Sequence, residues 1–259
     1  MSASTPKLRL RGVRKAFGTK QVLDGVDIDI PAATSLVVIG GSGSGKSVLI
    51  KCILGLIEPD EGTIELDGTN LLTMNREARE AALGTMGMLF QNGALFDSLP
   101  VWENVAFGLV ARRQASGAEA RRRADEVLAQ VGLAASVGDL WPAELSGGMQ
   151  KRVALARAIA RKPEIIFFDE PTTGLDPIMG AVIDGLIVDV VKRLGSTAIA
   201  ITHDMASAGR IADSVAMLHK GRIIWQGPVA EIDRSGNAYV EQFIHGRAEG
   251  PIKMPVRPL

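Results

Sequence analysis

Residues 35–47 read SLVVIGGSGSGKS, and this stretch decides the fold of the chain. Its first five residues form a largely apolar run that ends at a glycine, as a fully buried β-strand does. Its last eight residues fit the pattern GxxxxGK(S/T), in which glycines let successive backbone N–H groups face inward around a phosphate. A helix expected from about residue 45 to 56 adds the positive end of its dipole. The stretch therefore predicts a strand, a phosphate-binding loop and a helix in succession.

Two side chains of this loop carry the chemistry that a nucleoside triphosphate needs. Lys46 is expected to reach the β- and γ-phosphates, and the Ser47 hydroxyl to ligate Mg²⁺. A flexible Gly/Ser loop is the alternative, but it gives no structural reason for a Lys-Ser pair. ATP and Mg²⁺ are therefore the expected cofactors. The predicted binding residues of the loop are Gly40, Gly41, Ser42, Gly43, Ser44, Gly45, Lys46 and Ser47.

A second apolar run, residues 165–168, ends in two acidic residues, Asp169 and Glu170. Buried strands rarely carry acids unless these are paired or bound to a metal. Asp169 is therefore expected to ligate Mg²⁺, directly or through water, and Glu170 to act as the base that polarises an attacking water. Such a strand end could instead cap a helix, but the phosphate loop upstream favours the catalytic interpretation.

Charge and composition exclude several classes of protein. The 29 Lys and Arg residues balance 29 Asp and Glu, and 46% of residues are hydrophobic, so intrinsic disorder is excluded. The absence of a basic excess argues against a nucleic-acid partner, and the single cysteine, Cys52, excludes an intramolecular disulfide framework. The sequence opens without the apolar segment of a signal peptide, and no apolar run approaches the roughly 18–20 residues of a spanning helix. We therefore expect a soluble protein of cytosolic type.

Apolar runs and helical patterns alternate along the chain, which predicts an α/β fold of the P-loop NTPase kind with a mostly parallel sheet. Alternation at 26–30, with an earlier strand around 8–13, indicates an N-terminal antiparallel β subdomain. Further strands are expected at 63–66, 84–91, 165–168 and 197–201, helices at 147–161 and 177–194, and a hairpin from 214–218 and 222–225.

Changes in composition along the sequence also divide the chain into regions. Residues 92–160 interrupt the alternation with Ala/Arg-rich segments such as 118–131, so we expect an inserted helical subdomain there. The nucleotide-binding domain is expected to span residues 7–245. The remaining residues, 246–259, contain three prolines and predict an extended arm that either frays or docks on a neighbouring subunit.

Residues 145–150 read LSGGMQ, shortly before the second apolar run. Together with the phosphate loop, this hexapeptide closely resembles the signature of the ATP-binding cassette (ABC) ATPases. Its core, Ser146, Gly147 and Gly148, is intact. Met149 stands where Gln is commoner. Because the core opens an expected helix it forms a second anion site, and the resemblance implies that this site closes over the ATP of a second copy, in a head-to-tail dimer with two ATP molecules at the interface.

The same resemblance implies roles for four further residues. Phe17 matches the aromatic that stacks on adenine, where Tyr is more usual, with an ordinary core residue as the alternative. Gln91, at the end of the strand expected at 84–91, matches the glutamine that contacts Mg²⁺ and the attacking water. Asp176 matches the loop that links the two sites across the dimer, and His203 the histidine that holds the γ-phosphate and the water. The implied catalytic residues are Lys46, Gln91, Glu170 and His203, and the implied metal ligands are Ser47, Gln91 and Asp169.

Residues 93–105 read GALFDSLPVWENV, which is more apolar and aromatic than a surface loop needs. This segment resembles the cassettes of the Mla/MCE-type phospholipid transport systems, whereas importers of amino acids or sugars more often have Pro-His in place of Asp97-Ser98. The resemblance implies a groove for an integral-membrane permease made by a separate chain, with packing inside the helical subdomain as the alternative. It also implies a lipid-binding MCE protein, a STAS-domain subunit and a peripheral position on the cytoplasmic side of the inner membrane.

The function that these resemblances imply is ATP hydrolysis that drives phospholipid movement between the membranes of a Gram-negative-type envelope. An importer ATPase for a small polar solute is the alternative, because it would share every catalytic motif. A non-transport ABC ATPase usually carries a long coiled coil or two cassettes in one chain, and this sequence shows neither. A purely regulatory nucleotide-binding module would lack Glu170 or His203.

Overall fold

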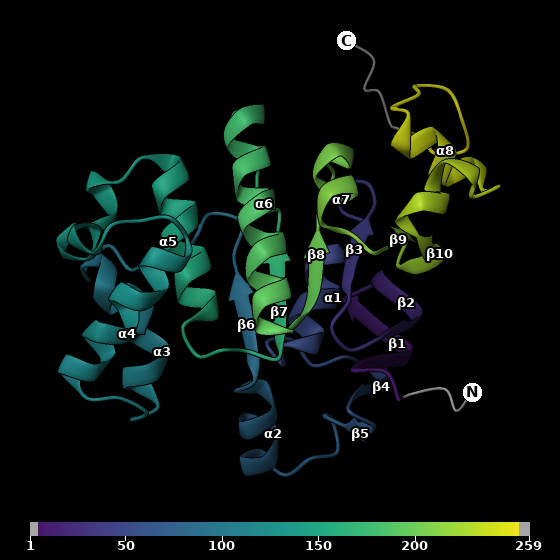
Figure 1. The fold of residues 1–259 in the computed structure, drawn as a ribbon. Helices are drawn as coiled ribbons and strands as arrows, with labels where there is room; N and C mark the ends of the chain where they lie inside the picture. Colours follow the sequence, from purple (N-terminus) through teal and green to yellow (C-terminus); the bar gives the residue numbers. More distant parts are fainter. Residues whose placement is uncertain (1–4, 254–259) are drawn as a thin grey trace.

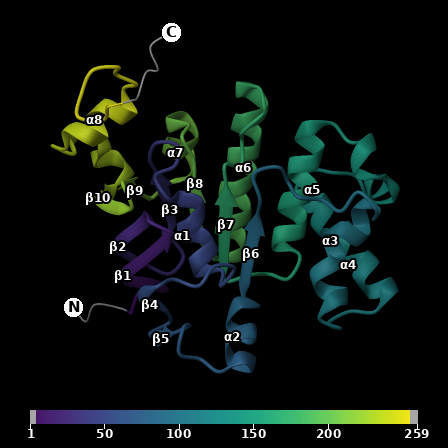
Figure 2. The ribbon, with the colours of Figure 1, turned by 180° about the vertical axis from the view of Figure 1, so that it is seen from behind.

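Two β-sheets of different kinds organise residues 5–253, the part of the chain that the computed structural model describes (Figures 1 and 2). The N-terminal sheet has the order β2-β1-β4-β5, and its pairs are antiparallel. Its strands are β1 (Leu8–Phe17), β2 (Lys20–Ile30), β4 (Glu61–Leu66) and β5 (Thr69–Asn70). Buried and exposed residues alternate along the second half of β2, so one face of this sheet meets solvent.

The central sheet has the order β10-β9-β3-β8-β7-β6. β9 and β10 form an antiparallel hairpin, and the other pairs are parallel. The strands are β3 (Ser35–Ile39), β6 (Met86–Leu89), β7 (Ile165–Asp169), β8 (Thr197–Ile201), β9 (Ser214–His219) and β10 (Arg222–Pro228). The middle strands are continuous apolar runs because both faces of the sheet are covered. This confirms the predicted α/β fold with a mostly parallel sheet.

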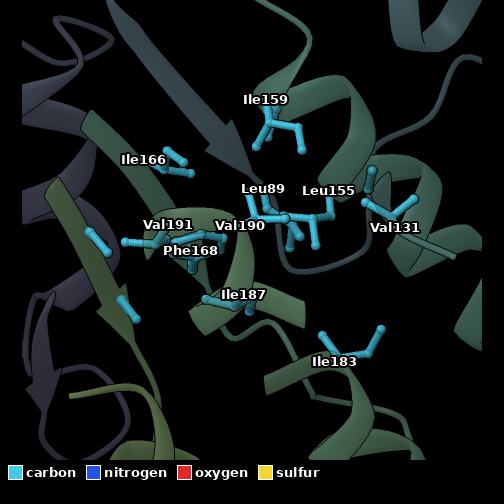
Figure 3. Packing of buried hydrophobic residues seen from close by; sticks show 14 of the residues in the cluster. Leu89, Val131, Leu155, Ile159, Ile166, Phe168, Ile183, Ile187, Val190 and Val191 are labelled. Carbon is cyan, nitrogen blue, oxygen red and sulfur yellow. The ribbon is translucent and has the colours of Figure 1, made fainter. Parts of the chain in front are cut away.

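Successive residues of the parallel strands enter two different hydrophobic cores, because side chains alternate between the faces of a sheet. Phe168 belongs to the core formed with α5 (Gly147–Ile159) and α6 (Pro177–Leu194), where it lies near Ile187 and Val190 (Figure 3). Phe167 belongs to the core formed with α1 (Lys46–Ile53) and the N-terminal sheet. Both rings are fully buried. This coverage on both sides holds the carboxyl ends of the strands in fixed positions.

Three helices lie together beyond the β6 edge of the central sheet (Figures 1 and 2). They are α3 (Val101–Ala111), α4 (Gly117–Gln130) and α5, with 3₁₀ turns at Ala135–Asp139 and Pro142–Glu144 leading into α5. Small buried side chains such as Ala120 and Ala124 let these helices approach closely. The helices fall within the range 92–160, and their status as a separate subdomain stays a prediction.

Several boundaries differ from the sequence prediction. α1 ends at Ile53 rather than at 56, and Gly55 follows with a left-handed φ of +68°. β6 ends at Leu89, so the prediction that Gln91 ends a strand is wrong, and Gln91 lies in the exposed turn that follows. The helices α2 (Arg76–Leu83), α7 (Met205–Ile211) and α8 (Ala238–Ile244) were not predicted. No helix within residues 5–253 has both the length and the apolar character that a membrane crossing requires.

The predicted arm, 246–259, is described as far as residue 253. Residues 246–253 curl back onto α8 instead of extending, because the Gln242 side chain holds them. Its amide nitrogen donates to the carbonyls of Arg247 and Ile252, both at 3.1 Å, and its oxygen accepts from the N–H of Ile252 at 2.7 Å. The expected extended conformation is therefore wrong for this part, and residues 254–259 lie outside the described residues.

Candidate nucleotide site

The phosphate loop leaves β3 and is wedged between neighbouring strands before α1 begins at Lys46. Gly40 has a φ of +153°, and a Cβ there would lie 2.3 Å from the carbonyl oxygen of Leu218 in β9. Gly45 has a φ of +108°, and a Cβ there would lie 2.8 Å from the carbonyl oxygen of Val22 in β2. Because only glycine fits at either position, the loop is fixed at the carboxyl end of β3 by backbone on both sides.

A cavity of about 500 Å³ lies next to this loop. The carboxyl ends of β3, β7 and β8 contribute to it, which is where open α/β sheets place their ligands. The structure thus brings together the phosphate loop and the residues predicted to bind Mg²⁺ and water, and adds Phe243 of α8, which was not predicted. The cavity is lined by Gly40, Gly41, Ser42, Gly43, Lys46, Ser47, Gln91, Asp169, Glu170, His203 and Phe243.

A second cavity, of about 420 Å³, also borders the loop. It is lined by residues 43–48 together with Phe17, Lys20 and Val22. Phe17 is 48% exposed, which excludes the alternative that it is an ordinary core residue, and the Lys15 ammonium lies 5.7 Å from the centre of its ring. An exposed aromatic ring beside a phosphate loop offers a flat face on which a base can stack.

The Lys46 ammonium is held against the loop itself. It donates to the carbonyl oxygens of Gly40 at 2.7 Å and Gly41 at 3.1 Å. Burial lowers the pKa of Lys46, and the nearby carboxylates of Glu170 and Asp169 partly offset that effect. A cation that is desolvated and bonded to neutral carbonyls is poised to exchange them for phosphate oxygens.

Glu170 and His203 lie in close contact at the wall of the cavity. The distance from His203 Nδ1 to Glu170 Oε2 is 2.8 Å, and the Thr173 hydroxyl donates to the same oxygen at 3.2 Å. Glu170 has a left-handed φ of +50°, and its N–H donates to the carbonyl of Ile201 at 2.9 Å. Strained backbone of this kind clusters at functional sites, because the surroundings must hold it. The carboxylate is therefore fixed at the point where two parallel strands end.

The Asp169 carboxylate supplies the observation that tests the fit of a metal ion. Its Oδ1 is buried and has no hydrogen-bond partner within the described part of the chain. Burial and the neighbouring Glu170 charge raise the pKa of Asp169. A buried polar atom without a partner indicates a missing ligand, and Ser47 and Gln91 place two further oxygen donors on the same cavity. This oxygen donor set fits Mg²⁺, with nucleotide phosphates completing the coordination.

Sequence reasoning missed a second cation close to this site. Lys151 of α5 is only 7% exposed, and its ammonium donates to the backbone carbonyl of Gln91. Burial lowers the pKa of Lys151, while the Asp169 and Glu170 carboxylates favour its charged form. Its position directly after the LSGGMQ sequence was the available signal. Through this bond, Lys151 ties the turn that contains Gln91 to α5, the helix that begins at the LSGGMQ sequence.

The signature core lies outside both cavities at the phosphate loop. Ser146 and Gly147 are exposed, and the Ser146 hydroxyl caps α5 by accepting from the N–H of Met149 at 3.3 Å. Gly148 is buried, and a Cβ there would lie 3.1 Å from the sulfur of Met179 in α6. Within one chain, therefore, the signature is an open helix N-terminus that does not contribute to this chain's own phosphate site.

Asp176 is likewise not brought together with the other predicted residues. Its side chain caps α6 by accepting from the N–H groups of Ile178 and Met179, both at 3.0 Å. It lines neither cavity at the loop, and the adjacent Ile178 is 80% exposed. The role of Asp176 in linking two sites stays a prediction.

These features define the class of protein. A glycine-rich loop at the end of a buried parallel strand, a lysine at the start of the next helix and an acid at the end of a neighbouring strand are the parts of a P-loop nucleotide-binding fold. The paired Glu170 and His203 add groups that can orient water, so the arrangement suits hydrolysis of a nucleoside triphosphate.

Comparison with known proteins gives the family. The family profile described as "ABC transporter" matches residues 23–173, more than half of the chain. The chain is 37% identical to "Intermembrane phospholipid transport system ATP-binding protein MlaF" of Escherichia coli (strain K12), over 94% of this chain and 90% of that protein. It is also 37% identical to "Probable ribonucleotide transport ATP-binding protein mkl" of Mycobacterium leprae, over 95% of this chain and 71% of that protein.

Solved structures agree with this assignment. A dimeric structure of the ATP-binding cassette MJ0796, in a post-hydrolysis state bound to ADP and Pi, matches with a TM-score of 0.78 at 30% identity, covering 86% of this chain and 98% of that chain. The chain therefore belongs to the ABC transporter ATP-binding family. As a member of that family it binds nucleotide, hydrolyses ATP and works with membrane-embedded transporter subunits.

Proposed function

We propose that this chain is the ATPase subunit of a transporter that moves phospholipids between the two membranes of a double-membrane envelope. The observation that carries the catalytic part is the single cavity shared by the phosphate loop, Asp169, Glu170 and His203. The phospholipid part is supported by the sequence at 93–105 and by the 37% identity with MlaF over nearly the whole of both chains.

Binding of ATP uses the two cavities on either side of the loop residues. The adenine base stacks on Phe17, and the backbone of residues 40–45 receives the phosphates. The Lys46 ammonium leaves the carbonyls of Gly40 and Gly41 for the β- and γ-phosphates. That exchange replaces neutral partners with charged ones and so offsets the burial that lowers the Lys46 pKa.

Hydrolysis requires positioning and charge neutralisation more than covalent chemistry. The Glu170 carboxylate orients the attacking water and accepts its proton. His203 holds the γ-phosphate and helps to orient the same water. The hydrogen bond from the Thr173 hydroxyl and the short contact to His203 keep the Glu170 side chain in place. Mg²⁺ held by Ser47, Gln91 and Asp169 supplies charge neutralisation at the phosphates.

A second copy of the chain completes the site. Ser146 and Gly147 are exposed at an open helix N-terminus, and the signature core lines neither cavity at the phosphate loop of its own chain. In a head-to-tail dimer each signature covers the γ-phosphate bound by the other copy, with Asp176 linking the two sites. Neither half is sufficient alone, so ATP binding closes the dimer and hydrolysis opens it again.

The permease contacts the helical region at an exposed aromatic pair. The rings of Phe96 and Phe107 lie 4.6 Å apart, and they are 41% and 43% exposed. Asn104 is fully buried and pins the loop before α3, because its side chain bonds to the backbone of Phe96 and Leu99 at 2.7 to 3.0 Å. Exposed aromatics on a rigid support are typical of protein docking sites.

The identity of the co-purifying chains and lipids tests the transported substrate. We expect an affinity-tagged complex extracted from membranes to contain a permease, an MCE protein, a STAS-domain chain and bound phospholipid, with this chain peripheral on the cytoplasmic face of the inner membrane. The similarity to mkl, whose name refers to ribonucleotide transport, favours the importer alternative. Recovery of a permease with a solute-binding protein and no phospholipid would support that alternative instead.

A further inference from the structure

We call the cavity of about 500 Å³ that contains Glu170 and His203 the catalytic cavity. Phe243 lines it, although this residue belongs to none of the nucleotide-binding motifs. It comes from α8, close to the end of the chain, and shares the cavity wall with Glu170 and His203. Its ring is partly buried and packs against the hydrophobic core that lies under α6 and α7. A phenyl ring offers no donor or acceptor for the reaction, so its contribution is apolar surface.

The helix that carries Phe243 is docked firmly on the β9-β10 hairpin. Asn237 caps α8 by accepting from the N–H of Tyr239 at 3.0 Å, and its amide nitrogen donates to the carbonyl of Ile224 in β10 at 3.1 Å. The Tyr239 ring lies 5.0 Å from the ring of His219, where β9 ends. The beginning of α8 is therefore fixed to the same strand whose Leu218 carbonyl abuts Gly40.

The end of α8 is fixed by the tail that follows it. We call Gln242 and residues 247–252 the C-terminal clasp. Gln242 is 6% exposed. Both polar atoms of its side-chain amide are hydrogen-bonded to the backbone of Arg247 and Ile252, in three bonds altogether. Gly250 has a φ of +156°, and a Cβ there would lie 2.4 Å from Gln242 Cδ. The clasp closes tightly around the residue that precedes Phe243.

We propose that Phe243 is a positioning residue for ATP hydrolysis, held in the catalytic cavity by the C-terminal clasp. There its ring keeps bulk water away from the Glu170 carboxylate, which is 13% exposed and lies beside the exposed His203. The proposal rests on the proposed roles of those two residues. Apolar surface beside the site lowers the local dielectric, which strengthens the interaction of Glu170 with the attacking water and of His203 with the phosphate. Loss of the ring admits further water molecules and leaves the attacking one less well oriented.

The steady-state ATPase activity of the full chain, with kcat and KM measured separately, tests this inference. We expect Phe243→Ala to lower kcat about tenfold with little change in the KM for ATP, and Phe243→Leu, which keeps an apolar side chain, to restore most of the activity. Gln242→Ala is expected to lower kcat in the same way. The double variant is expected to resemble Phe243→Ala alone, because both changes act through one ring.

Matched controls separate this role from a structural one. Ile244→Ala removes a neighbouring apolar side chain of α8 that does not line the cavity, and Gln226→Ala removes a glutamine outside the clasp. The proposal is overturned if Phe243→Ala and Ile244→Ala have the same kcat. It is also overturned if the losses of kcat in Phe243→Ala and Gln242→Ala multiply in the double variant. Glu170→Gln is measured alongside. If it keeps wild-type turnover, the proposed function fails, whereas an inactive Glu170→Gln beside a fully active Phe243→Ala refutes the positioning role alone.

Discussion

Replacing Arg210 with methionine is expected to reduce the free energy of unfolding by about 3 kcal/mol at pH 7. Asp184 in α6 is fully buried, and its carboxylate accepts from the Ser207 hydroxyl at 2.7 Å and from the Arg210 guanidinium at 2.8 Å, both in α7. Removing the guanidinium leaves a buried carboxylate with one neutral donor. The value is at the low end of the range for broken buried pairs, because Arg210 is 44% exposed and the site is reached by water.

The pH dependence of this loss has a definite sign. Burial raises the pKa of Asp184, and Arg210 and Ser207 partly counteract it, so Arg210→Met raises that pKa further. Between the ordinary carboxyl pKa and the raised one, the folded state binds more protons than the unfolded state, and stability falls as pH rises. The difference between variant and wild type is therefore expected to be larger at pH 7 than at acidic pH.

Chemical denaturation followed by circular dichroism, at several pH values and without nucleotide, measures the effect. In a parallel thermal melt, a loss of about 3 kcal/mol corresponds to a fall in Tm of about 6–12 °C. Arg222→Met is the matched control, because Arg222 pairs with Asp24 on the surface. Its loss is expected to reduce the free energy of unfolding by less than about 1 kcal/mol. The double change Asp184→Leu with Arg210→Met is expected to recover stability. Equal losses for the two single arginine variants, or a loss independent of pH, would refute the reasoning.

Three further predictions concern the nucleotide site and its supporting helix. Lys46→Ala is expected to abolish ATP binding, measured by calorimetry, because the phosphates lose their cation; unchanged affinity contradicts this. Phe17→Ala is expected to weaken ATP binding about tenfold, while Phe17→Tyr keeps it, since a ring is needed for stacking; equal affinities would exclude stacking. Burial raises the pKa of the Cys52 thiol to about 11, so iodoacetamide at pH 8 is expected to label it only after unfolding, as mass spectrometry would show.

The elements with strong local signals could be predicted from the sequence. β3 coincides with the expected strand, because its apolar run is buried on both faces. α6 coincides with the expected helix at 177–194, because Asp176 caps its start, Pro177 suits its first turn and Gly195 ends it with a φ of +64°. Apart from Phe243, the residues that line the catalytic cavity were predicted from motifs whose spacing reflects the strand ends that meet there.

Other features depend on contacts that no local pattern encodes. α7 and α8 have seven residues each, too few for a helical period to be visible in the sequence. Gln91 follows an apolar run that continues past the last pairing of β6 with β7, so the run alone misplaced the end of the strand. Phe243 lines the catalytic cavity from a short helix, and the hydrogen bonds between Gln242 and the tail have no counterpart in the proline pattern that predicted an extended arm.

The oligomeric state of Glu170→Gln in the presence of ATP and Mg²⁺ tests the central claim most directly. The claim is that Glu170 drives hydrolysis at a site which a second copy closes. Light scattering after size exclusion is expected to give a dimer of the 27.4 kDa chain for Glu170→Gln with ATP, and a monomer for Lys46→Ala under the same conditions. A monomeric Glu170→Gln that turns over ATP at the wild-type rate would contradict the account.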